Sequence, residues 1–157
     1  MLAIKHVLFL LPNTCGQRGK HIKNTQKYLF CYLCAMNWFE ALPSDCPPDE
    51  AFPPDDTFFR LGSIPPEDSD FWSHRQRFPH KVFQVSECIA RSLSVFDDLE
   101  AVLRLKRLLP SMRSKPVFQV DLTEKDGLVQ QTGNDMHHFS WWRTTEFDLN
   151  IVKIFEK

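Results

Sequence analysis

Two histidines and two tryptophans occur within six residues, in the run His137 to Trp142 (HHFSWW). Imidazole nitrogens exchange protons near neutral pH, and indole rings stack on planar molecules. The run has the residue types of a strand, so the two histidines should diverge to opposite faces rather than bind one metal. We expect His138, Ser140 and Trp142 to share one face and to form a candidate site for a planar ligand. The alternative is a core strand whose polar atoms are simply satisfied.

Three further polar residues are candidates for holding an anion. Ser92 and Ser94 precede a segment with helical periodicity, and we expect Ser94 to cap that helix, whose first N–H groups could bind a phosphate. Arg60 lies within an expected strand, where a guanidinium needs either a structural salt bridge or a ligand. If Arg60 lines one cleft with these serines and His138, the chemistry would be that of an enzyme, with His138 as acid or base.

The cysteines offer a weaker possibility of metal or redox chemistry. Cys31 and Cys34 have the C-x-x-C spacing of zinc and redox sites, but no further ligands follow at short spacing, so we predict no metal. The favoured interpretation is two small apolar side chains, and Cys88 is expected in the core. An odd number of cysteines without a recognisable signal peptide is typical of reduced thiols, which predicts a cytoplasmic protein. The five cysteines are Cys15, Cys31, Cys34, Cys46 and Cys88.

The elements that must position these residues are mainly short strands. Alternating or β-branched runs bounded by turn residues predict strands, whereas the acidic start, apolar stripe and basic end of one segment predict a helix. This pattern favours a single α+β domain with a mostly antiparallel sheet and one or two packed helices. The expected strands are 57–63, 116–122, 127–132, 137–142 and 149–155; 81–85 is a short extended piece, and the helices are 70–77 and 96–109.

The net charge of -1 hides an uneven distribution of charged residues along the 157-residue chain. Residues 1–35 carry five basic residues and no acid, whereas the rest has a net charge of -6. We therefore divide the chain into a basic segment at 1–35, an acidic proline-rich segment at 36–56, and the α+β domain at 57–157. The prolines of 43–66 predict an extended surface segment or linker there.

Three interpretations apply to residues 1–35. An export signal is disfavoured because the apolar run after Lys5 is only five residues long before Pro12. A basic arm that touches nucleic acid would bind weakly, with only five charges. The favoured interpretation is that the natural chain starts at Met36. No stretch has the roughly 18 apolar residues of a membrane span, and the mildly acidic body argues against general nucleic-acid binding.

A set of motifs in residues 43–145 resembles a family of small uncharacterised bacterial proteins. These motifs are FFRL, PPEDSDFWS, SECIARSLSVF with the following DLEAVLRLKRLLP, and HHFSWW. The resemblance implies an independent bacterial domain and assigns no activity to it.

The order of Arg60, Ser92 with Ser94, and then His138 or Glu146 is also loosely similar to the ADP-ribosyltransferase fold. That likeness implies a site for NAD, built from an early basic residue, a Ser-x-Ser strand and a late polar residue. The sequence departs from the pattern in two respects: Ser94 is expected to start a helix, and no Glu-x-Glu or Gln-x-Glu is present.

These observations favour a small cytosolic binding or interaction domain without catalysis, whose partner is a protein or a small molecule and not a membrane. The alternative is an ADP-ribosyltransferase-like enzyme acting on a nucleotide-like substrate. The sequence assigns no cofactor.

Overall fold

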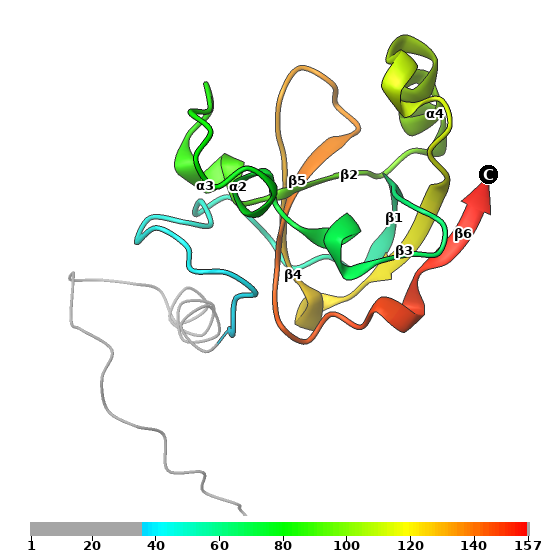
Figure 1. Cartoon of the computed structure of the whole chain (residues 1–157). Coiled ribbons are helices and arrows are strands. Elements are labelled where there is room, and N and C mark those ends of the chain that lie inside the picture. The colour runs from blue at the N-terminus through cyan, green and yellow to red at the C-terminus, as the bar shows by residue number, and fades with distance from the viewer. Residues whose placement is uncertain (1–35, 157) are drawn as a thin grey trace, which may run out of the picture. The chain divides into compact units, whose positions relative to one another are not determined.

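The computed structural model of the chain describes residues 36–156 (Figure 1). The expectations for residues 1–35, including the pair Cys31 and Cys34, lie outside the described residues. From Asn37 onward the described residues belong to one compact unit.

Six antiparallel strands form one sheet, with the order β4-β5-β2-β1-β3-β6. With the helices described below, this confirms the predicted α+β domain. Five of the strands lie where alternation or β-branched content predicted them, within a few residues at each end. The strands are β1 (Asp56–Leu61), β2 (Leu93–Phe96), β3 (Val117–Leu122), β4 (Gly127–Gln131), β5 (His138–Arg143) and β6 (Lys153–Glu156).

The sheet has two faces that carry different cores. Residues directly opposite each other on antiparallel strands share a face, so the strand register assigns every side chain. We call one side the α4 face; it carries Phe59, Phe96 and Val117, on which helix α4 packs. We call the other side the η1 face; it carries the larger aromatic cluster, into which the short helix η1 inserts Phe71. The buried residues of that cluster include Phe58, Val95, Phe118, Val120, Val129 and Trp141.

The predicted helix 96–109 is shorter than expected, and Ser94 does not cap it. Helix α4 spans Leu99–Leu108, and the side chain of Asp98 accepts the N–H of Ala101 as its N-cap. Ser94 instead lies in the middle of β2, which pairs with β5 from Leu93 to Phe96. The prediction failed because the acidic residues after Phe96 gave a strong helix start, whereas the ladder with β5 recruits the preceding apolar run into the sheet.

Shorter helices connect the remaining elements. The predicted helix 70–77 is divided into η1 (Asp68–Phe71) and α2 (His74–Arg77), because Ser73 starts a new helix with its own capping box. The expected extended piece at 81–85 is not a strand, and α3 (Glu87–Ala90), which the sequence did not predict, follows it. Three further short helices are η2 (Pro110–Met112), η3 (Glu124–Asp126) and η4 (Leu149–Ile151).

The proline-rich segment 36–56 is attached to the domain along its length. Trp38 bridges to Thr144, and Phe52 bridges to Val129 on the edge strand β4. The Phe39 ring lies 3.5 Å from the guanidinium carbon of Arg143. The segment therefore covers the β4–β5 end of the sheet instead of acting as a free linker.

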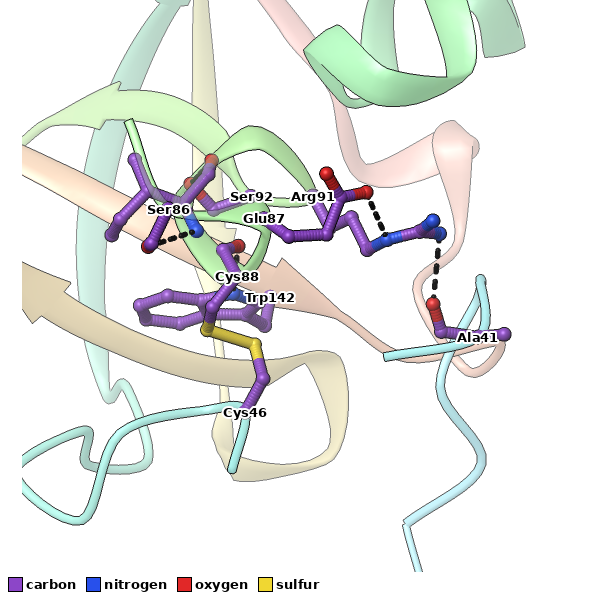
Figure 2. The surroundings of a disulfide bond; sticks show 9 residues. Ala41, Cys46, Ser86, Glu87, Cys88, Arg91, Ser92 and Trp142 are labelled. Carbon is purple, nitrogen blue, oxygen red and sulfur yellow. Dashed lines mark hydrogen bonds and ion pairs between the residues drawn. A yellow bond between two sulfur atoms is a disulfide. The ribbon is translucent and has the colours of Figure 1, made fainter. Parts of the chain in front are cut away.

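A disulfide joins this segment to α3. Cys46 and Cys88 are bonded, which corrects the expectation of reduced thiols for these two residues (Figure 2). The sequence could not reveal the pairing, because 42 positions separate the two cysteines and only the fold brings them together. Arg91 adds a second attachment nearby, because its Nη1 donates to the Ala41 carbonyl at 2.9 Å and to Glu40 at 3.1 Å.

None of the helices in the described part of the chain is long and apolar enough to cross a membrane.

Candidate functional site

A hollow of about 230 Å³ lies on the α4 face, between helix α4 and the loop that joins β4 to β5. Its helical wall is mostly apolar, and its opposite wall is polar, from the backbone and side chains of the loop. His138, at the start of β5, is a candidate site residue from the sequence that lines it. The lining residues are Phe96, Ala101, Arg104, Leu105, Leu108, Thr132, Gly133, Asn134, Asp135 and His138.

The surrounding contacts orient the imidazole of His138. Its Nδ1 lies 3.0 Å from the Thr132 carbonyl oxygen and 3.2 Å from the Thr132 hydroxyl. A carbonyl oxygen only accepts hydrogen bonds, so Nδ1 carries the proton in the neutral ring and Nε2 presents a lone pair. The ring packs edge-on against Phe96, with centroids 5.3 Å apart. Among the described residues Nε2 has no hydrogen-bond partner, which leaves it available to a ligand.

An ion pair lies at the rim of the hollow. Arg104 and Asp135 are 3.2 Å apart, between α4 and the β4–β5 loop. The backbone N–H of His137 and then the guanidinium of Arg104 lower the pKa of Asp135, so this carboxylate stays charged at neutral pH. Because the two charges compensate each other, the hollow as a whole does not select strongly for an ion.

Ser94 and Ser140 lie opposite each other on β2 and β5, on the same face as His138. The Ser140 hydroxyl is buried and lies 2.9 Å from that of Thr132. It therefore belongs to the group of contacts that holds Thr132 against His138. Ser94 is half-buried, and its hydroxyl has no hydrogen-bond partner among the described residues.

Ser92 and Trp142 have structural contacts beneath α3 and do not line the hollow. The Ser92 hydroxyl donates to the Ile89 carbonyl at 2.9 Å. The Trp142 ring is buried, and its Nε1 donates to the Cys88 carbonyl at 3.0 Å (Figure 2). The indole that the sequence placed beside a planar ligand is thus covered by the disulfide-bonded segment.

Arg60 projects from the η1 face, on the opposite side of the sheet from His138. Its Nε donates to the Asp70 carbonyl at 2.8 Å and its Nη1 to the Ser94 carbonyl at 2.5 Å. The expected structural salt bridge is therefore replaced by two backbone carbonyls. The structure does not bring Arg60 and His138 into one cleft, because the sheet lies between their side chains.

Sequence reasoning missed two groups of residues that the fold brings close together. The first group completes the lining of the hollow and comprises Thr132, Arg104 and Asp135. Thr132 and Asp135 lie in the loop between β4 and β5. Arg104 belongs to a basic run that is explained by the preference for cations near a helix C-terminus. Arg77 and Arg143 gather near Arg60, although 66 positions of sequence separate them and no motif connects them. No group of three or more histidine, cysteine, aspartate or glutamate side chains within residues 36–156 is arranged to hold a metal ion.

The chain matches no known protein-family model, no curated protein and no solved structure.

Proposed function

We propose that this chain is a non-catalytic binding domain that takes a small, planar, largely apolar molecule into the hollow beside His138. The observation that carries the proposal is the orientation of His138, whose Nδ1 is held by Thr132 while Nε2 is left without a partner. A ligand with one N–H or O–H donor would satisfy that nitrogen, and its ring would pack against Phe96 and Leu105. The volume suits one or two fused rings.

Catalysis is not part of this proposal, because the hollow offers His138 no second reactive group. Asp135 is engaged by Arg104, and the Ser140 hydroxyl is buried against Thr132. The alternative is an ADP-ribosyltransferase-like enzyme. It gains support from Ser94 lying on a strand, as that fold requires, but it loses support because Arg60 projects from the other face of the sheet.

The location of the protein follows from a separate observation. The sequence favoured the cytoplasm, but a disulfide between Cys46 and Cys88 persists best in an oxidising environment. We therefore propose that the domain functions outside the reducing cytosol.

The binding proposal is tested by nuclear magnetic resonance of the full chain with indole, phenol and adenine as probes. We expect at least one probe to give saturable shifts confined to α4 and the β4–β5 loop. His138→Phe keeps the ring contact with Phe96 and removes the acceptor, so it should weaken binding about tenfold or more.

The matched control is His137→Gln, since His137 contacts Asp97 at 2.8 Å and does not line the hollow. It should bind the probe as the unmodified chain does. The proposal fails if no probe binds at the hollow, or if both variants bind equally well.

A further inference from the structure

Three arginines from three different elements donate to three consecutive backbone carbonyls of η1. They come from β1, α2 and β5, so the sheet and the helix both contribute to the cluster. Arg60 is half-buried and Arg77 is exposed, and they donate to adjacent peptide groups. Their guanidinium groups are close enough for the charge of Arg77 to act on Arg60. The pairs are Arg77 Nη2 with the Ser69 carbonyl, Arg60 Nε with the Asp70 carbonyl, and Arg143 Nη1 with the Phe71 carbonyl.

Carboxylates compensate only part of this positive charge. Asp68 forms an ion pair with Arg143 at 3.0 Å. The carboxylate of Asp70 forms no ion pair with these arginines and accepts the N–H and hydroxyl of Ser63 and the N–H of Glu67. Among the described residues, neither Arg60 nor Arg77 has a carboxylate within ion-pair distance.

The electrostatic consequence is visible in two titrating groups. Burial and then the charges of Arg77 and Arg143 lower the pKa of Arg60 to about 10, against the opposing effect of Asp70. Burial and then Arg60, Arg77 and Lys81 also lower the pKa of His74, which lies on α2. At neutral pH His74 is therefore uncharged, and the cluster keeps the charges of Arg60 and Arg77.

Contacts with η1 and with Ser94 on β2 use only part of the hydrogen-bonding capacity of these two side chains. A guanidinium has five N–H donors, and the protein engages two on Arg60 and one on Arg77. Arg60 Nη2 has no partner among the described residues. Arg77 is exposed, and Arg60 is half-buried above the Phe71 ring, so their remaining donors are accessible to an anion.

We propose that Arg60 and Arg77 form a binding site for a phosphate group on the η1 face, separate from the hollow beside His138. Two adjacent guanidinium groups match the two negative charges of a phosphate and can bind its oxygens with paired hydrogen bonds. A carboxylate would leave one of the two positive charges uncompensated.

The test follows the ring signals of His74 in the full chain during titration with inorganic phosphate at constant pH and ionic strength. We expect a saturable shift of His74 and of the backbone signals of η1, and no such shift with acetate. Arg77→Gln should weaken phosphate binding about tenfold or more, because it removes charge-assisted hydrogen bonds.

The matched control is Arg107→Gln, which removes the same charge from an exposed position on α4. It should change the affinity less than twofold. Equal weakening by both variants would mean that phosphate responds only to overall charge and would overturn the proposal, as would the absence of saturation.

A second arm distinguishes the source of the phosphate group. Adenosine monophosphate and glycerol 2-phosphate replace inorganic phosphate in the same titration. Tighter binding of either ester, lost in Arg77→Gln, would identify a phosphorylated metabolite as the ligand. Tighter binding of inorganic phosphate would identify the free ion.

Discussion

The two faces of the sheet differ in how they are covered. The η1 face is closed by aromatic rings: Phe71 is stacked or tilted against Phe118 and Phe147 and meets Trp141 edge-on, and no part of its ring is exposed. Around Phe96 and His138 the α4 face is covered by one ten-residue helix, which leaves a hollow, whereas Trp142 on the same face lies beneath α3. The difference suggests that stability is concentrated on the first face, and that the space for a ligand ring is on the second.

Charge is distributed differently over the two faces as well. On the α4 face the rim charges of Arg104 and Asp135 compensate each other. Beside the η1 face, Arg60 and Arg77 lack carboxylate partners in the described part of the chain, and burial and then the charge of Arg77 lower the pKa of Arg60. One face is therefore suited to a neutral ring and the other to an anion.

The largest expected effect compares the packing of the two faces. Phe71→Ala should lower the free energy of unfolding by about 5 kcal/mol, because it leaves a cavity among three rings, whereas Phe96→Ala should cost about 3 kcal/mol, since Phe96 already borders the hollow. Urea denaturation of both variants measures the difference. Equal losses would contradict the view that the η1 face carries more of the stability.

The disulfide gives the next largest effect, on the segment that covers Trp142. Replacing Cys46 and Cys88 by serine together should cost about 4 kcal/mol of stability, because the bond closes a loop of more than forty residues. Reductant should destabilise the unmodified chain to a similar extent and leave the double variant unchanged. If reductant has no effect on the unmodified chain, the bond does not form in solution.

The smallest effect concerns acid stability at the edge of the α4 face. Hydrogen bonds from Lys153, Thr57 and Gln119 lower the pKa of Asp121 to about 2. Since an unfolded aspartate titrates near 3.9, the stability from this depressed pKa is fully present above that value and is lost as the pH falls toward 2. Unfolding of Asp121→Asn, followed against pH, should show a weaker decline in that window.

Lys153→Gln is a second test of this acid effect, because it removes the first cause of the lowered pKa of Asp121 and keeps the carboxylate. Its decline in stability between pH 4 and pH 2 should also be weaker than that of the unmodified chain. A decline as steep as in the unmodified chain for both variants would show that other carboxylates dominate acid unfolding.

The local sequence pattern predicted strands correctly where one element could be considered alone. The alternation in 116–122 predicted β3, and β1 lies within one or two residues of the strand predicted at 57–63. It failed between Ser92 and Asp98, where helix-start residues directly follow a strand. Capping signals are local, whereas the pairing of β2 with β5 is formed by residues more than forty positions apart.

The candidate site was predictable only in part. His138 was named a candidate because two histidines beside two tryptophans are unusual, and it lines the hollow. Ser92 and Trp142 were named as well, but they lie beneath α3 and do not line it. Alternation shows that neighbouring residues on one strand face opposite ways, yet it does not say which face of one strand matches which face of another. That choice depends on register, and it is what separates Arg60 from His138.

By itself the sequence determined the fold class, the strands with clear alternation and the acidic character of residues 36–157, because these depend on composition and on periods of a few residues. Only the tertiary structure decided the pairing of Cys46 with Cys88, the hollow beside His138 and the meeting of Arg60, Arg77 and Arg143 at η1. Each of these joins residues far apart in the chain, and only the order and register of the strands bring such residues together.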